Sequence, residues 1–200
     1  QAVDVMRTDN FRFIEIEHKY LVGNDFDRPR FGESLAAIGP NRIKTIRVRD
    51  QYYLTEGGPA GGYLVRHRFD TELQQLTIKS LAPDTEVRDE INLELGLGSG
   101  DQAAQVNAFL TRMGVRWRGT VSKDLRVWYF DECEVVHYVA STESQTLQCV
   151  EFEATRKASL SDALAVLERF ERATGFWGLA RSRLSLPQLL FPELSAHLSG

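Results

Sequence analysis

The amino-acid sequence predicts an α+β protein, an antiparallel sheet or barrel of about eight strands with helices packed outside it. Many short segments alternate apolar and polar residues with a period of two, which is typical of strands whose two faces meet different surroundings. Glycine and proline residues separate these segments at short intervals, as turns between antiparallel strands do. Two other segments carry apolar residues at the spacing of an amphipathic helix.

The strands are expected where the alternation is clearest. In the first of them Glu15, Glu17 and Lys19 have odd numbers, whereas the apolar Ile16 and Tyr20 have even numbers. Successive side chains of a strand point to opposite faces, so the charges share one face and the apolar groups the other. Similar patterns place the strands at Phe11–Val22, Arg47–Leu54, Tyr63–Thr71, Leu73–Ser80, Thr85–Leu95, Arg116–Phe130, Glu134–Ser141 and Leu147–Thr155.

Helices are expected in three places before the C-terminal tail. Asp101–Met113 carries apolar residues three and four positions apart on one face. Ser161–Thr174 does so as well, with Ser161 predicted as its N-cap and Gly175 as its C-cap. The stretch Gly32–Ile38 is predicted to form a short helix between the first two strands.

Length and composition fit one soluble domain over residues 1–200, with a core at about 11–175 and a helical tail at 176–200. With 24 basic and 28 acidic residues the formal charge is −4, which argues against a nucleic-acid partner. No apolar run is long enough to cross a membrane, and no secretory signal is recognised. Cys133 and Cys149 match neither a disulfide framework nor a zinc site, so a cytoplasmic protein is expected.

Charged residues recur on one face of five expected strands. Beyond the first strand they stand at Arg66 and Arg68, at Lys79, at Arg88 and Glu90, and at Glu151 and Glu153. A solvated outer face explains such a pattern, and so does a closed barrel with a charged, water-filled lumen. The composition favours the lumen, because arginine pairs suit phosphate oxygens and paired glutamates suit Mg²⁺ or Mn²⁺. A metal-bound polyphosphate needs both.

The motifs also follow one another in a recognisable order. They are Glu15-Ile16-Glu17-His18-Lys19, Asp50-Gln51-Tyr52-Tyr53-Leu54, Leu64-Val65-Arg66-His67-Arg68, Leu76-Thr77-Ile78-Lys79, Arg88-Asp89-Glu90 and Val150-Glu151-Phe152-Glu153-Ala154. This set resembles the strands of the CYTH superfamily, the triphosphate tunnel metalloenzymes, over about residues 11–175. The family includes class IV adenylyl cyclases, thiamine triphosphatases and inorganic triphosphatases. The resemblance implies an eight-stranded antiparallel closed barrel, substrates with a linear triphosphate, and a divalent metal cofactor, Mg²⁺ or Mn²⁺.

The resemblance also implies roles for single residues. The phosphate-binding residues would be Lys19, Arg66, Arg68, Lys79 and Arg88. The metal would be held by Glu15, Glu17, Glu151 and Glu153. Glu15 or Glu17 would orient the attacking water, and Glu90 would complete the acidic, catalytic side.

The sequence departs from the family pattern in three places. The basic strand carries Lys123 and Arg126 three residues apart, so both cannot share a face without a bulge, and Arg126 is the better candidate for a substrate contact. The family's aspartate ligand falls in register near His137, which could ligate Mn²⁺. The family's late lysine has Arg181 or Arg183 in its place.

The expected function is hydrolysis of inorganic triphosphate or of a small organic triphosphate by a metal-dependent enzyme. One alternative is the class IV cyclase reaction, in which ATP gives cAMP and pyrophosphate. A second is a module that binds polyphosphate or a nucleotide without turnover, and a third is a plain β-domain with a solvated charged face. A small-molecule triphosphate is the expected partner, and two copies could pair through an exposed strand or helix.

Overall fold

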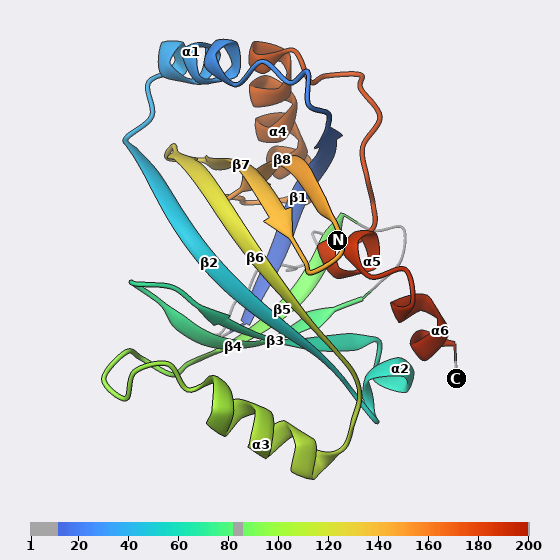
Figure 1. The fold of residues 1–200 in the computed structure, drawn as a ribbon. Coiled ribbons are helices and arrows are strands. Elements are labelled where there is room, and N and C mark those ends of the chain that lie inside the picture. The colour runs from blue at the N-terminus through green and yellow to red at the C-terminus, as the bar shows by residue number, and fades with distance from the viewer. Residues whose placement is uncertain (1–11, 82–85, 200) are drawn as a thin grey trace.

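In a computed structural model of the protein, which describes residues 12–81 and 86–199, antiparallel strands close into a barrel. Around the barrel the order is β1-β5-β4-β3-β2-β6-β7-β8 (Figure 1). The strands are β1 (Arg12–Val22), β2 (Arg42–Thr55), β3 (Tyr63–Phe69), β4 (Gln74–Ser80), β5 (Val87–Glu94), β6 (Val115–Tyr129), β7 (Cys133–Ser141) and β8 (Thr146–Ala154). The closed barrel that the family resemblance implied is confirmed.

Helices pack around this barrel and connect its strands. They are α1 (Arg28–Ile38), α2 (Gly58–Gly61), α3 (Ala103–Met113), α4 (Leu160–Thr174), α5 (Leu186–Leu190) and α6 (Leu194–Leu198). In Figure 1, α1 and α4 lie together at one end of the barrel, α3 lies at the other end, and α5 and α6 lie along one side. No helix of the described residues has the length and apolar character that crossing a bilayer requires.

Two apolar clusters lie between the outer face of the barrel and these helices, and a further cluster joins Tyr52 and Tyr138, which line the barrel interior, to Leu186 of α5. Under α4, the buried Leu167 and Phe170 share a cluster with Ile16 of β1 and Phe152 of β8. At the other end, Val106 of α3 belongs to a second cluster, with the buried Tyr53 and Val65.

In β1, β3 and β8 the apolar face is turned outward, so the alternate, charged face is turned into the barrel. Strands β2 and β6 differ, because aliphatic residues such as Val48 and Leu125 line the cavity and polar residues such as Arg47 and Asp124 are exposed.

The pairing of β1 divides the strand between two neighbours. Its first half pairs with β5, with Glu15 opposite Arg88. Its second half pairs with β8, with Glu17 opposite Glu153 and Lys19 opposite Glu151. This register brings the first charged motif against two motifs that lie about 70 and 130 residues later in the chain.

Element boundaries differ from the predicted ones in a few places. Strand β2 begins at Arg42, five residues before the predicted start, and it pairs along its length with the long strand β6. The N-cap of α4 is Ser159, whose side chain accepts a hydrogen bond from the Asp162 backbone, so Ser161 was the wrong choice. Helix α1 is a full turn longer than expected, because Asp27 caps it. The predicted strand starts at residues 11 and 85 lie outside the described residues.

Candidate active site in the barrel interior

The barrel interior holds a cavity of about 330 Å³ lined by charged side chains. They come from β1, β3, β4, β5, β6, β7 and β8: Glu15, Glu17, Lys19, Arg66, Arg68, Lys79, Arg88, Lys123, Glu134, Glu151 and Glu153. A second cavity of about 640 Å³ shares Glu15, Glu134 and Glu153 with the first, so these carboxylates stand where the two cavities meet. The faces predicted to carry the charges therefore point into the lumen, which settles the choice between a solvated outer face and a tunnel.

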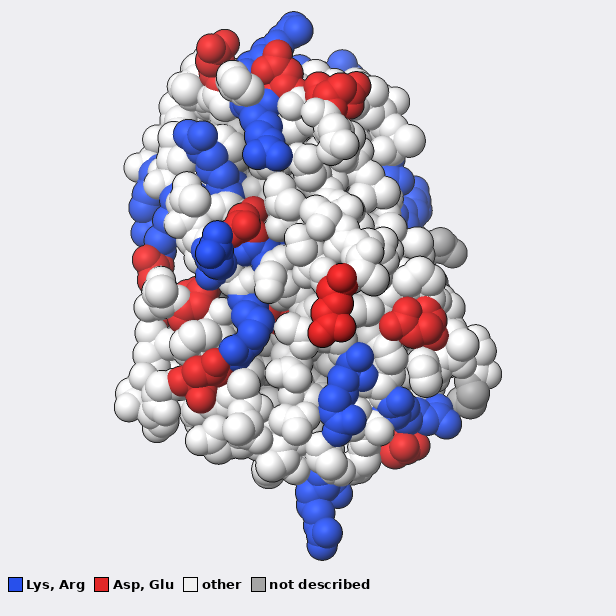
Figure 2. Space-filling model, viewed as in Figure 1, with Lys and Arg blue, Asp and Glu red and all other residues white. Residues whose placement is uncertain are grey.

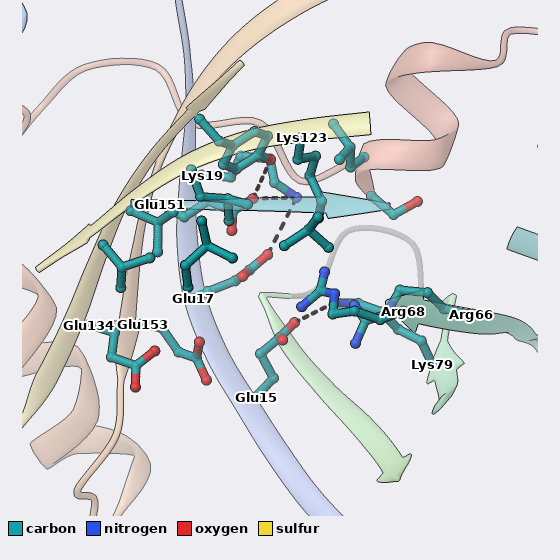
Figure 3. A pocket seen from close by; sticks show the side chains of 18 of the residues that line it. Glu15, Glu17, Lys19, Arg66, Arg68, Lys79, Lys123, Glu134, Glu151 and Glu153 are labelled. Carbon is teal, nitrogen blue, oxygen red and sulfur yellow. Dashed lines mark hydrogen bonds and ion pairs between the residues drawn. The ribbon is translucent and has the colours of Figure 1, made fainter. Parts of the chain in front are cut away.

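The outside of the molecule has a different distribution of charge. On the face shown in Figure 2, basic and acidic side chains are interspersed and separated by wide uncharged areas. Inside the barrel, in contrast, carboxylates Glu134 and Glu153 lie on one side of the view and Arg66 and Arg68 on the other (Figure 3). A separation of this kind inside a low-dielectric wall can hold a ligand that carries both anionic groups and bound cations.

Two arginines on the basic side offer hydrogen-bond donors to the cavity. Nη2 of Arg66 lies 3.5 Å from Oγ1 of Thr77, while its Nε is buried without a hydrogen-bond partner among the described residues. Nη2 of Arg88 donates to the backbone oxygen of Arg183 at 2.9 Å, and its Nε and Nη1 likewise have no partner in the described part of the chain. Buried donors without acceptors are costly, and a phosphate oxygen would satisfy them.

Carboxylates crowd the acidic side. Glu153 is opposite Glu17 on β1 and opposite Glu134 on β7. Burial, together with the charges of Glu15 and Glu17, raises the pKa of Glu153 well above its usual range. Burial and the charge of Glu17 also raise the pKa of Glu15 from its ordinary 4.5 to about 7. A bound cation would reduce the repulsion between these carboxylates.

Lysine side chains already offset part of this repulsion. Nζ of Lys19 lies 3.4 Å from Glu17 and 3.5 Å from Glu151 (Figure 3). Burial alone would raise the pKa of Glu151, but the charge of Lys19 and a 2.5 Å hydrogen bond donated by Tyr138 outweigh it and lower that pKa. Glu151 is therefore ionised at neutral pH and can bind a cation.

A second lysine, Lys79, joins two strands of the acidic side. Its Nζ lies 2.9 Å from Oε1 of Glu15 and 3.0 Å from Oε1 of Glu90. Burial opposes the charge of Glu90, but Lys79 and Arg66 outweigh burial and lower the pKa of this carboxyl. Glu90 therefore stays ionised, which makes it a poor proton acceptor compared with Glu15.

A buried aspartate forms ion pairs with two further basic side chains, Arg68 and Lys123. Asp50 of β2 is fully buried, accepts two hydrogen bonds of 2.7 Å from Arg68, and lies 2.7 Å from Nζ of Lys123. Burial opposes ionisation, yet Arg68 and Lys123 hold the pKa of Asp50 well below its usual range. Burial lowers the pKa of Lys123 to about 8 despite its partner. Asp50 thus fixes the positions of two cations that face the lumen.

Two predicted site residues lie outside the lumen. Arg126 is exposed on the outer face of β6, with its guanidinium 5.1 Å from the ring of Trp128, so the prediction of a substrate contact is wrong. Of the two basic residues Lys123 and Arg126, it is Lys123 that points into the cavity. His137 also points outward from β7, where it bonds Gln148 at 3.2 Å and packs against Phe26, so it cannot join a metal site in the tunnel.

The parity of β6 and β7 explains both corrections. On β7 the lumen residues are Glu134, Val136 and Tyr138, the set that alternates with His137. Glu134 was missed, although its position two residues from Val136 follows the same alternation. Of the two late arginines, Arg181 lies outside the tunnel, where it contacts His18 at 3.0 Å and Glu86 at 3.1 Å.

The donor set fits Mg²⁺ or Mn²⁺ if a substrate supplies the missing ligands. The described residues contain no group of three or more side chains already placed to hold a metal ion. Carboxylates of Glu15, Glu17, Glu151 and Glu153 nevertheless line one cavity, and burial, together with neighbouring carboxylates, raises the pKa of Glu15 and of Glu153. Mg²⁺ is commonly held by one or two carboxylates together with substrate phosphates and water, which such a site allows.

We expect the metal-free protein to be more stable at pH 6 than at pH 8. The folded pKa of Glu15, about 7, exceeds its ordinary 4.5, so its stabilising contribution is complete below pH 4.5 and is lost as pH rises to 7. Between pH 6 and pH 8 the loss amounts to roughly 1.3 kcal/mol, since about one pKa unit of the shift is lost over that interval at 1.36 kcal/mol per unit. Thermal unfolding in a chelator at both pH values measures it, and a higher Tm at pH 8 would contradict the assignment. Added Mg²⁺ should raise Tm more at pH 8 than at pH 6.

Comparisons with known proteins agree with this fold. The sequence matches no protein-family model and no curated protein. The structure is similar to the PH1012 protein of Pyrococcus horikoshii, with a TM-score of 0.68 and 16% identity over 88% of this chain and 99% of that one. It is also similar to a candidate adenylate cyclase of Bacillus halodurans, with a TM-score of 0.59 and 17% identity over 90% and 98% of the two chains.

A third similar structure comes from the plant Hippeastrum. It is a candidate adenylyl cyclase described as having a dominant triphosphatase activity, with a TM-score of 0.54 and 15% identity over 92% of this chain and 95% of that one. At such identities the likeness concerns the fold. The comparisons bear out the closed barrel with helices outside it that the sequence predicts.

Proposed function

We propose that this chain is an enzyme of the CYTH kind that binds a triphosphate inside its barrel, together with Mg²⁺ or Mn²⁺, and hydrolyses it. One observation carries the proposal. Within a closed barrel, cationic side chains from β1, β3, β4, β5 and β6 and carboxylates from β1, β7 and β8 line one cavity. A triphosphate with a bound cation is the kind of ligand whose charges complement both sides.

The phosphate chain would lie against the guanidinium groups of Arg66, Arg68 and Arg88. The partnerless donors of Arg66 and Arg88 are aimed at no acceptor in the described chain and can bind phosphate oxygens. Lys19, Lys79 and Lys123 would add charge as the chain enters, each exchanging part of its carboxylate contact for a phosphate contact. As charge grows on the phosphoryl oxygens during reaction, fixed donors of this kind lower its energy.

The metal would be held by Glu15, Glu17, Glu151 and Glu153 together with the phosphates. When bound, such a cation offsets the repulsion between carboxylate and phosphate and polarises the phosphoryl group. Glu134, which the sequence prediction left out, lies beside Glu153 and adds to the negative field at this position.

Glu15 is the residue best suited to accept a proton from the attacking water. Without a bound cation, burial and the charge of Glu17 raise the pKa of Glu15 to about 7, whereas Glu90 is held ionised by Lys79 and Arg66. The water oxygen would attack the terminal phosphorus, its proton would pass to Oε of Glu15, and the bond from phosphorus to the bridging oxygen would break. The leaving diphosphate carries away that electron pair, which the arginines stabilise.

Product analysis tests the proposal. The protein is incubated with inorganic triphosphate and, separately, with ATP, each with Mg²⁺ or Mn²⁺, and phosphate, pyrophosphate and cAMP are followed. We expect phosphate release, and we expect Glu17→Gln to lower it by about 10²-fold or more. Glu33→Gln is the matched control, because Glu33 is exposed on α1 outside the barrel.

Other products would point to other functions. Pyrophosphate and cAMP from ATP would assign the cyclase reaction instead of hydrolysis. Metal-dependent binding of triphosphate without any product would assign a binding module. If the protein released no product and bound no triphosphate, the proposal would be refuted.

A further inference from the structure

Residues 176–185, which we call the α4–α5 linker, connect helix α4 to helix α5 and pair with β1 on the way (Figure 1). The backbone N–H of Ser182 donates to the backbone oxygen of Lys19 at 2.8 Å, and the two residues form an antiparallel bridge. The pairing of β1 with β5 ends at Ile16, so the linker takes the next place along that side of β1. It is therefore attached to the strand that supplies Lys19 to the cavity.

The α4–α5 linker also holds one of the arginines that line the cavity. Nη2 of the buried Arg88 donates to the backbone oxygen of Arg183 at 2.9 Å. Nε and Nη1 of the same guanidinium have no hydrogen-bond partner among the described residues. A planar guanidinium that is held at one nitrogen points its other donors in fixed directions. The position of the Arg183 backbone therefore decides where Arg88 can meet a phosphate oxygen.

A cluster of charged side chains anchors the α4–α5 linker outside the cavity. Nη2 of Arg181 lies 3.1 Å from Oε1 of Glu86, and Nη1 lies 3.0 Å from Nδ1 of His18. The buried ring of His18 also contacts Glu171 of α4, which accepts a hydrogen bond of 2.8 Å from the hydroxyl of Tyr20. The cluster thus joins the linker to α4, to β1 and to the residue that precedes β5.

Two contacts connect the linker to the segment that carries Arg88. Arg181 pairs with Glu86, and two residues further along both segments the backbone oxygen of Arg183 accepts from Arg88. The ion pair consists of directional, charge-assisted contacts, which specify one position of the linker beside β5. Burying such charges is costly, and apolar residues of similar volume often stabilise a fold as well. Precise placement of the linker is a gain that apolar residues would not supply in the same way.

We propose that Arg181 is a positioning residue for Arg88: its contacts with Glu86 and His18 fix the α4–α5 linker so that the Arg183 backbone aims the Arg88 guanidinium at the phosphate chain. The inference rests on the proposed function, because Arg88 is a phosphate contact there. Arg181 itself lies outside the cavity and acts through the linker. Its removal should therefore weaken phosphate binding without removing any group that touches the substrate.

A double-mutant cycle tests the inference. Hydrolysis of inorganic triphosphate with Mg²⁺ is compared by kcat/KM in the unmodified protein, Arg181→Ala, Arg88→Ala and the double variant. We expect Arg181→Ala to lower kcat/KM about tenfold, because a displaced binding group loses much of its effect. In the Arg88→Ala background the same change should cost less than about twofold, since the residue that Arg181 positions is then absent. Equal losses in the two backgrounds would overturn the inference.

Further variants separate positioning from a loss of stability or charge. The side chain of Arg181 is 30% exposed, so its truncation should leave the protein folded, which thermal unfolding checks. Arg172→Ala is the matched control, because it removes the same charge from the exposed face of α4 and should leave kcat/KM within about twofold. Arg181→Lys keeps a cation for Glu86 and should recover at least half of the loss, and a variant as impaired as Arg181→Ala would count against the inference. Glu86→Ala removes the partner instead and should repeat the result of Arg181→Ala, including its dependence on Arg88.

Binding measurements distinguish failure of this inference from failure of the proposed function. A guanidinium can bind phosphate without a metal, so calorimetry with inorganic triphosphate in a chelator follows the contact of Arg88 apart from turnover. Hydrolysis by the unmodified protein, with additive effects of Arg181→Ala and Arg88→Ala, refutes the inference and leaves the hydrolase intact. Binding without hydrolysis refutes the hydrolase, and the same cycle of dissociation constants then decides the inference. Absence of both hydrolysis and binding refutes both.

Discussion

Arg66→Ala is expected to lower kcat/KM for triphosphate hydrolysis by about 10²–10³-fold, the effect of removing one fixed donor to a developing anionic charge. The guanidinium of Arg66 is buried in the barrel, and its Nε has no acceptor among the described side chains and backbone groups. Its removal should therefore take away a contact that the substrate makes and leave few internal contacts broken. Steady-state kinetics with the preferred triphosphate measures the change.

Arg126→Ala is the matched control for this prediction. Arg126 lies on the exposed face of β6, and its guanidinium contacts Trp128 rather than the cavity. We expect the Arg126 variant to keep kcat/KM within about twofold of the unmodified protein, since exposed surface changes are usually small in effect. Equal losses in both variants would mean that the two arginines act through stability or solubility, and that the tunnel is not the site of reaction.

Asp50→Ala is expected to lower the free energy of unfolding by about 3–5 kcal/mol, the usual cost of removing one partner from a buried ion pair. Asp50 is fully buried and is the carboxylate that Arg68 and Lys123 share. Without it, the Arg68 charge would remain buried without its partner, and Lys123, whose pKa burial already lowers to about 8, would lose its proton more readily. Urea unfolding followed by circular dichroism measures the loss.

Added anion should partly rescue the Asp50 variant. Triphosphate can neutralise the freed cations, so it should raise the Tm of Asp50→Ala by more than it raises that of the unmodified protein. Asp124→Ala is the control, because Asp124 pairs with the exposed Arg47 on the surface, and its loss should change stability little. A small destabilisation in Asp50→Ala, without rescue, would show that Asp50 does not organise these cations.

Much of the site could be predicted because alternation along a strand is a local property. Glu15, Glu17 and Lys19 share a face whatever their neighbours are, and the same holds for Arg66 with Arg68. Where one face of a strand is apolar and packs under the helices, as in β1 and β8, a closed barrel must turn the other face inward. The sequence therefore predicted the strands, the charged faces and, with the family resemblance, the residues that meet in the lumen.

The error at β6 was avoidable, because the alternation of this strand is clear over most of its length. Arg118, Thr120, Ser122, Asp124 and Arg126 form one exposed polar face, which leaves Lys123 on the opposite face, toward the cavity. The choice of Arg126 did not apply this local parity. The position of His137 was taken from the order of family motifs, and the pairing of Glu134 with Glu153 shows that the opposite parity faces inward.

The sequence by itself determined which side chains share a face, because that depends on one strand's geometry. Only the tertiary structure decided how those faces meet: that Asp50 joins Arg68 to Lys123, and that Glu134 stands beside Glu153. These contacts depend on strand register and barrel closure, which bring together residues distant in the chain. Register results from the packing of the whole barrel against its helices, and no single segment encodes it.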